Sequence, residues 1–109
     1  MRMTNIAFTT TNWSEIKPTI HAGEIGEALW RTQHFGDIRV RRVSYSPGYV
    51  ADHWCNKGHV LYCLTGELIT DLQDGRKFVL NAGMSYQVAD DIDAHRSSTA
   101  VGAELLIID

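Results

Sequence analysis

From Ile38 onward the chain alternates between short apolar segments and clusters of turn-forming residues. Each apolar segment is rich in β-branched and aromatic residues, and Gly, Pro, Asn or Asp bounds it. No segment carries convincing helical periodicity, and turn signals return roughly every 8 to 12 residues, as in sandwiches and barrels. The pattern therefore predicts an all-β protein, either a sandwich or a barrel.

Turn residues set the ends of the expected strands. The segment from Ile38 to Tyr45 is expected to end at Ser46-Pro47-Gly48, because Pro removes a ladder donor. Gly66 is expected to join two strands in a tight hairpin, and Asp74-Gly75 is the strongest hairpin signal in the chain. The strands expected after Ile38–Tyr45 are 59–65, 67–72, 78–80, 85–88, 95–100 and 103–108.

The N-terminal third has a less regular pattern. Its apolar residues have no clean period, and Gly23 and Gly26 argue against a helix. We expect one domain over residues 1–109, with an irregular arm at 1–27 and a barrel at 28–109 whose first strand covers 28–33. Such an arm is expected to cover a strand edge or to cross to a second subunit.

Composition excludes some classes of partner. Of the 109 residues, 44% are hydrophobic and 21% charged, and the formal net charge is −3, which gives no electrostatic reason to expect nucleic acid. In the one basic cluster, alternation puts Arg39 and Arg41 on one face and Arg42 on the other, so we interpret it as a solvated strand edge. No stretch has the length of a membrane span or the pattern of a signal peptide, so the expected location is cytoplasmic, without a membrane partner.

Three histidines and a cysteine are spaced so that a barrel would bring them together. His53 and Cys55 are two residues apart and share a face of an extended strand. His59 follows a short turn, and His95 begins a later strand. Imidazole and thiolate are ligands for Zn, Fe(II), Ni or Cu, so one divalent transition metal is expected, with Zn or Fe preferred. The alternative for each His is a structural hydrogen bond, and for Cys55 a place in the core, which is also the role expected of Cys63.

These residues resemble the two motifs of the cupin superfamily. The matching residues of the first motif are Gly48, His53, Cys55, His59 and Gly66, and those of the second are Gly83, His95 and Thr99. The chain also resembles the small single-domain cupins with an Asp-His-Cys-Trp type motif, here Asp52-His53-Trp54-Cys55. The resemblance implies a double-stranded β-helix, a jelly-roll barrel, with a metal bound inside it.

The match departs from the family pattern at several positions. Cys55, His59 and Thr99 stand where the family has His, Glu and Asn, the gap before His95 is one residue longer, and Gly48 lies one residue closer to His53. The implied ligand set is therefore three neutral histidines and one thiolate instead of three histidines and one carboxylate. This exchange keeps the charge and favours softer metals.

The resulting expectation is a metal-binding cupin that acts as a metalloenzyme on a small polar substrate. A closed structural zinc site and a metal-dependent sensor or ligand-binding protein stay open as alternatives. Substrate contacts are expected from Tyr49, Gln87, Ser97 and Thr99, although alternation does not decide whether Ser85 and Gln87 or Tyr86 and Val88 face inward. The apolar outward face of Val60, Tyr62 and Leu64 favours a homodimer.

Overall fold

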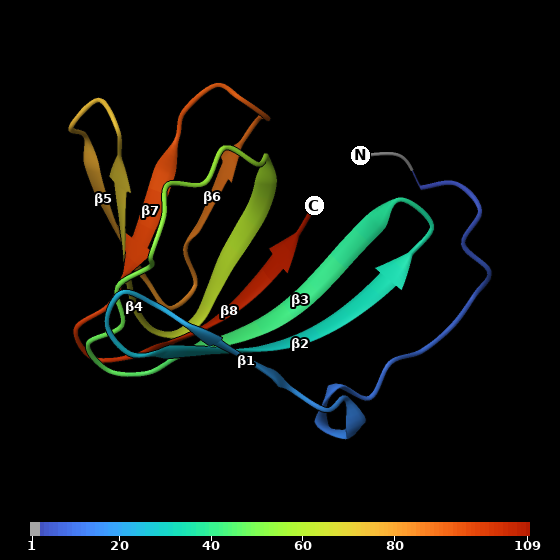
Figure 1. The fold of residues 1–109 in the computed structure, drawn as a ribbon. Helices are drawn as coiled ribbons and strands as arrows, with labels where there is room; N and C mark the ends of the chain where they lie inside the picture. The colour runs from blue at the N-terminus through green and yellow to red at the C-terminus, as the bar shows by residue number, and fades with distance from the viewer. Residues whose placement is uncertain (1–2) are drawn as a thin grey trace.

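The protein is almost entirely built from antiparallel β-strands, as the turn spacing predicted. The structure is a computed structural model that describes residues 3–109 (Figure 1). The only helical element of this part is the 3-10 turn η1 (Trp13–Glu15). The strands are β1 (Thr19–Ala22), β2 (Glu27–Phe35), β3 (Ile38–Tyr45), β4 (His59–Leu72), β5 (Lys77–Asn81), β6 (Ser85–Val88), β7 (His95–Ser98) and β8 (Ala103–Ile108).

One long strand joins the two sides of the barrel. The sheet has the order β1-β2-β3-β8-β4-β5, and β6 and β7 also pair with β4. The first half of β4 pairs with β6 and β8, and its second half with β5 and β7. In Figure 1, β5 and β7 rise on one side while β2, β3 and β8 run along the other. This arrangement is the jelly-roll barrel that the resemblance implied.

The continuity of β4 corrects one prediction. A tight hairpin was expected at Gly66, but the strand runs through it from His59 to Leu72. The register shifts between Cys63 and Thr65, and Gly66 has a φ of +80°. A bulge followed by a positive φ bends a strand without reversing it, and a Cβ at position 66 would collide with the carbonyl oxygen of Gly102. The glycine therefore allows β4 to pass from one sheet to the other.

Alternation along the strands fills one part of the interior with apolar side chains. On β8 the inward side chains include Leu105 and Ile107, which are buried, whereas Leu106 between them is only half-buried. Leu61, Leu68 and Leu105 are among the largest fully buried side chains. Burying a leucine stabilises a fold by about 1.5–3 kcal/mol, so this cluster contributes much of the barrel's stability.

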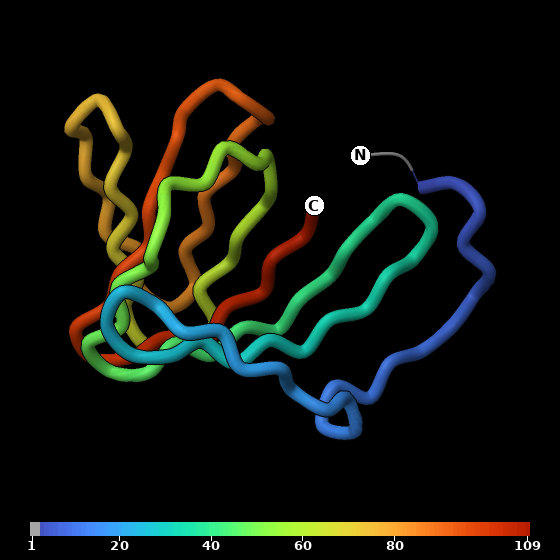
Figure 2. Tube along the Cα trace, in the orientation of Figure 1, coloured from blue at the N-terminus to red at the C-terminus, as the bar shows by residue number. Residues whose placement is uncertain are grey.

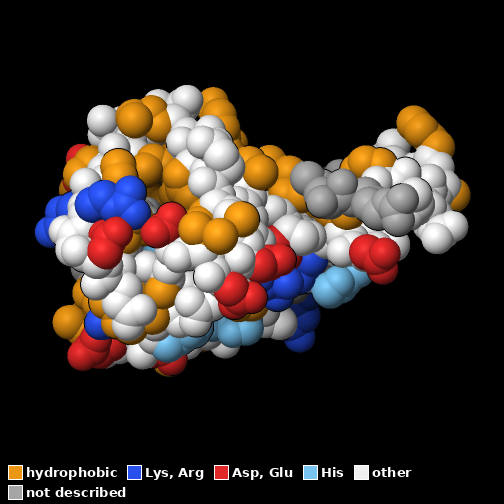
Figure 3. All heavy atoms as spheres, turned by 90° about the horizontal axis from the view of Figure 1, so that it is seen from above, with side chains coloured by type: hydrophobic (Ala, Val, Ile, Leu, Met, Phe, Trp, Pro, Cys, Tyr) orange, Lys and Arg blue, Asp and Glu red, His pale blue; other side chains and the backbone are white. Residues whose placement is uncertain are grey.

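The N-terminal arm is irregular only up to Pro18. The sequence did not predict β1, which pairs with β2 from Thr19 opposite Trp30 to Ala22 opposite Glu27. Before β1 the chain makes a wide excursion, and it lies beside the β2–β3 turn near Gly36 (Figure 2). Figure 3 shows this segment protruding from the body of the molecule. Within the described residues no helix is long and apolar enough to span a membrane.

The basic cluster on β3 is not a solvated strand edge, so that prediction is wrong. β3 lies between β2 and β8 and is hydrogen-bonded on both sides. Arg41 is only 6% exposed, and Arg39 is half-buried on the same inward face. The charges are held inside because Asp109, directly after β8, lies between them and the first residue of β4.

Candidate metal centre

Three of the four predicted ligands meet inside the barrel. His59 is the first residue of β4, and His95 is the first residue of β7. Cys55 forms an isolated bridge with His95, in which each backbone N–H donates to the other's carbonyl at 2.7 and 3.0 Å. Paired residues of an antiparallel bridge point to the same side, so the Cys55 thiol and the His95 imidazole face the same space. Potential ligand atoms of Cys55, His59 and His95 all lie within 4.8 Å of one another.

The ring nitrogens are oriented as metal ligands. Nδ1 of His95 donates to the carbonyl oxygen of Asp93 at 2.9 Å, which leaves Nε2 as the acceptor in the neutral ring. That Nε2 lies 3.1 Å from Nε2 of His59. Metal-binding histidines commonly donate their other nitrogen to a carbonyl in this way, because the bond fixes the tautomer and the ring orientation.

The electrostatic surroundings keep the donor groups available. Burial, with further contributions from His95 and Arg41, lowers the pKa of His59 to about 4, so this ring is neutral at neutral pH. The neighbouring His95 imidazole lowers the pKa of the Cys55 thiol, against the opposing effect of burial. The thiol in turn raises the pKa of His95. The pair therefore holds a labile proton, which a bound cation would replace.

The three side chains fit a divalent transition metal. In a tetrahedral zinc site with Zn–N distances of about 2.0–2.1 Å, two nitrogens lie roughly 3.3 Å apart, close to the 3.1 Å between His59 and His95. Nδ1 of His59 is buried without a hydrogen-bond partner, and it lies 3.9 Å from Oδ2 of Asp109. With Nε2 on an ion, the ring proton would sit on Nδ1 and face this carboxylate. Two nitrogens and one sulfur leave a tetrahedral ion one open position.

Tyr86 is a site residue that the sequence did not single out. It pairs with Leu61 on β4, so it is the inward residue of β6, whereas Ser85 and Gln87 are exposed. Its hydroxyl lies 2.9 Å from Nε2 of His59, and burial raises its pKa. The phenol therefore stays protonated beside the metal centre. Alternation on a strand of four residues carries too little information to choose between the two faces.

His53 does not join the other three ligands in this structure. Its side chain is 74% exposed, and Nδ1 lies 2.6 Å from Oδ1 of Asp52. It lines the same cavity as Cys55, but on the outside of the cluster. That His53 completes a four-ligand set stays a prediction.

A cavity of about 200 Å³ lies next to the cluster. Tyr49 and Ser97, two of the predicted substrate contacts, line it. Gln87 lines a different cavity, so it is separated from them. The Thr99 hydroxyl is used within the fold, because it donates to the carbonyl of Glu67 and accepts from the N–H of Gly102. Thr99 thus holds the β7–β8 turn against β4.

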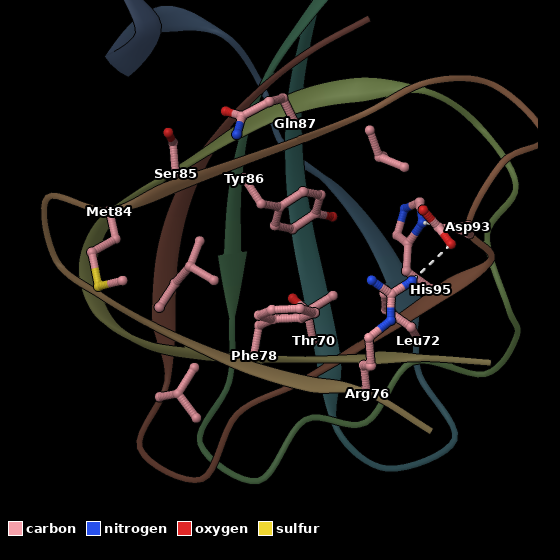
Figure 4. A pocket seen from close by; sticks show the side chains of 13 residues that line it. Thr70, Leu72, Arg76, Phe78, Met84, Ser85, Tyr86, Gln87, Asp93 and His95 are labelled. Carbon is pink, nitrogen blue, oxygen red and sulfur yellow. Dashed lines mark hydrogen bonds and ion pairs between the residues drawn. The ribbon is translucent and has the colours of Figure 1, made fainter. Parts of the chain in front are cut away.

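A second cavity, of about 390 Å³, also borders Tyr86 and His95 (Figure 4). Phe78, Tyr86 and His95 point into it, and Arg76 forms an ion pair with Asp93 at one side. Apolar side chains make up most of its remaining lining. Cys55 and His59 line only the smaller of these two cavities, so the complete cluster faces that one.

Comparison with known proteins supports the fold. No protein-family model and no curated protein sequence matches the chain. Among solved structures, a predicted oxalate decarboxylase from Thermotoga maritima is 18% identical with a TM-score of 0.78, covering 92% of this chain and 96% of that one. An RmlC-like cupin from Shewanella frigidimarina is also 18% identical, with a TM-score of 0.72 and coverage of 96% and 92%. The polyketide cyclase RemF from Streptomyces resistomycificus is 17% identical, with a TM-score of 0.78 and coverage of 94% and 78%. The chain therefore has the cupin fold, with a cluster of one cysteine and two histidines inside the barrel.

Proposed function

We propose that the protein binds one divalent transition metal through Cys55, His59 and His95 and acts as a metalloenzyme on a small polar substrate. The observation that carries this proposal is the convergence of three ligand atoms within 4.8 Å beside an internal cavity. A thiolate with two imidazoles favours zinc or Fe(II), and nickel and copper also accept these ligands. A bound ion would supply a Lewis acid and a water of lowered pKa at its open position.

The surrounding residues support a catalytic role over a closed structural site. With His53 exposed, three protein ligands leave a position for water or substrate, as catalytic zinc sites do. The Tyr86 hydroxyl lies 2.9 Å from Nε2 of His59, where it can donate a hydrogen bond to a ligand of the ion. Tyr49 and Ser97 supply further polar groups along the cavity. The solved neighbours include a predicted oxalate decarboxylase and a polyketide cyclase, so the cupin fold hosts proteins named as enzymes. Binding of a ligand without turnover uses the same site and is the alternative function.

Metal content tests the proposal directly. Protein purified without a histidine tag or chelator should contain about one transition-metal ion per chain by elemental analysis. His59→Ala and His95→Ala should lower metal affinity by at least about 100-fold, since even residues that only orient ligands contribute 10–100-fold. His34→Ala is the matched control, because His34 is exposed at the far end of β2.

Cobalt substitution then tests the sulfur ligand. Co(II)-loaded protein should show a thiolate charge-transfer band, which Cys55→Ser should abolish and Cys63→Ala should keep. His53→Ala tests whether the site has three protein ligands or four. If His53 is a ligand, this variant should lower metal affinity as much as His95→Ala does. Protein that contains no metal and takes up neither Zn(II) nor Co(II) would refute the proposal.

A second copy of the chain is the partner we propose. Val60 and Tyr62 on the outward face of β4 are 39% and 40% exposed, which is high for apolar side chains in the middle of a sheet. A homodimer would cover this face, and light scattering should then give twice the 12.2 kDa mass of one chain.

A further inference from the structure

Arg41 has a hydrogen-bonding group that the fold leaves unused. The residue is 6% exposed, and its Nε is buried without a hydrogen-bond partner. Its guanidinium lies over the ring of Trp30, 4.5 Å from the centroid, so its plane is held in place. Folded proteins pair nearly all buried donors, and an unpaired one often marks the place of a missing ligand or water.

The charges around Arg41 do not balance. Asp109 accepts two hydrogen bonds from Arg39, both at 2.9 Å, and one from Arg41 at 3.2 Å. Two guanidinium side chains thus share one side-chain carboxylate, so these three side chains together carry a net positive charge. A divalent ion bound by a single thiolate would add another.

The charged side chains that line the cavity beside the cluster are mostly basic. Four basic side chains line it, and no Asp or Glu is among its described lining residues. Arg96 has its own partner, Glu24, and Lys57 is exposed at the mouth. The four basic residues are Arg39, Arg41, Lys57 and Arg96. A buried, uncompensated positive charge is costly, so this space favours an anionic occupant.

Arg41 and the metal centre share this space. Both the guanidinium and the Cys55–His59–His95 cluster line the same cavity, and Asp109 links them, since its Oδ2 contacts both Arg41 and the His59 ring. The volume of about 200 Å³ corresponds to roughly six water molecules at about 30 Å³ each. Such a cavity holds only a small ligand, which would lie beside both Arg41 and the proposed metal centre.

We propose that this cavity is an anion site in which Arg41 binds the carboxylate or phosphate group of a small ligand next to the metal. The inference rests on the proposed function, because it names the class of ligand that would meet the open metal position. Arginine suits this role, since its planar fork matches the oxygens of both groups. Arg41 donates one hydrogen bond to Asp109 from its Nη2 group, which leaves its Nε–H for the ligand.

The experiment titrates oxalate, inorganic phosphate and the neutral acetamide into Co(II)-loaded and metal-free protein. Calorimetry gives the affinities, and the side-chain Nε–H signal of Arg41 in nitrogen-15 NMR reports contact in the unmodified protein. Oxalate or phosphate should bind saturably and shift this signal, whereas acetamide should not bind. The anion that binds more tightly shows whether the site prefers a carboxylate or a phosphate group.

Arg41→Met should weaken anion binding by about 10- to 100-fold, as expected for loss of a charge-assisted hydrogen bond. It should not lower Co(II) affinity, because it removes a positive charge that acts on His59. Arg42→Met is the matched control. It removes the same charge one residue along β3, together with an Nε that is likewise buried without a hydrogen-bond partner, but from a side chain on the other face that does not line the cavity. Arg42→Met should therefore change anion affinity by less than about twofold. Arg41→Lys keeps the charge but removes the planar fork, so it should also weaken anion binding. This variant serves as the test if Arg41→Met does not fold.

The possible results test the anion site and the metal centre separately. Metal uptake without binding of either anion would overturn the anion site and leave the metal centre standing. Anion binding that shifts the cobalt spectrum but not the Arg41 signal would also overturn it. Anion binding at Arg41 in protein that takes up no metal would retain the anion site and refute the metalloenzyme.

Discussion

The two ends of the barrel interior differ sharply, although the same strands build both. At one end the adjacent strands β3, β8 and β4 contribute a row of apolar side chains, and at the other a row of ionisable ones. The apolar row is Val43, Leu105 and Cys63, each 0% exposed and paired in register across the sheet. The ionisable row is Arg39, Asp109 and His59.

This difference shows that one end of the barrel stabilises the fold and the other positions the groups that bind a ligand. Burial of apolar area at the first end is favourable and needs no specific geometry. Buried charges at the second end are tolerated only when they are paired, and the pairing positions the groups that bind a ligand. The end that stabilises the fold therefore carries no chemistry, and the end that carries chemistry contributes less stability.

Leu105→Ala should give the largest loss of stability and no loss of the site. The side chain is completely buried between Val43 and Cys63, so its removal should lower the free energy of unfolding by about 2–5 kcal/mol. Metal bound per folded chain should stay the same. Leu106→Ala, on the outer face of the same strand, should cost about 1 kcal/mol or less. Urea denaturation measures both values, and equal losses would show that the apolar end is not the stabilising one.

Asp109→Asn should have a smaller effect at the ionisable end, and one that depends on pH. Burial alone would raise the pKa of Asp109, but the hydrogen bond from Arg39 and the charges of Arg41 and Arg39 lower it below the ordinary value. A carboxylate with a lowered pKa contributes its stability above the unfolded-state pKa of about 4 and loses it as the pH falls through the folded-state pKa.

The expected cost of Asp109→Asn is about 1–3 kcal/mol at pH 7 in metal-free protein, because the buried guanidinium of Arg41 and the half-buried one of Arg39 lose their anion. The difference from the unmodified protein should shrink as the pH falls below about 4. Asp71→Asn is the control, since its 3.7 Å pair with Lys77 is largely solvated and should contribute about 0.5 kcal/mol or less. A cost that is the same at every pH would contradict the ion-pair explanation.

The reactivity of the two cysteines compares the two ends of the barrel and perturbs the protein least. Cys55 is partly exposed and its pKa is lowered by the His95 imidazole, whereas burial raises the pKa of Cys63. In metal-free protein an alkylating reagent should modify Cys55 first, and Cys63 only on unfolding. Bound metal should protect Cys55, and mass spectrometry of both forms measures this. Equal reaction of Cys55 with and without metal would exclude it as a ligand.

Local sequence patterns were sufficient to predict most of the strands. The end of β3 at Ser46-Pro47-Gly48 is confirmed, and β6 and β8 have the predicted bounds, because Pro and Gly act through their own backbone conformations. Cys63 is confirmed as a core residue. The Gly66 prediction failed because a glycine with positive φ serves a turn and a bulge equally well, and only the pairing partners of β4 distinguish the two.

Spacing and the family resemblance pointed to three residues of the cluster, but His53, which was expected to share a face with Cys55, lies outside it. Cys55 and His95 come together as the paired residues of a β-bridge, and His59, the first residue of β4, brings its Nε2 within 3.1 Å of Nε2 of His95. Arg41 was misjudged, since alternation shows that it shares a face with Arg39 but not whether that face is inside. The charge of Arg41 suggested that its side chain lies on the outside of the barrel. Its partner Asp109, which makes the buried position possible, lies 68 residues away in the sequence.

The sequence by itself determined the all-β class, the ends of most strands and the residue types able to bind a metal, because each depends on local backbone preference or side-chain chemistry. Only the tertiary structure decided which face of each strand is buried, that β4 crosses between the sheets, and that Tyr86, Arg41 and Asp109 adjoin the cluster. These features depend on contacts between residues far apart in the chain. Such contacts form only when the strands pair in register, so no local pattern records them.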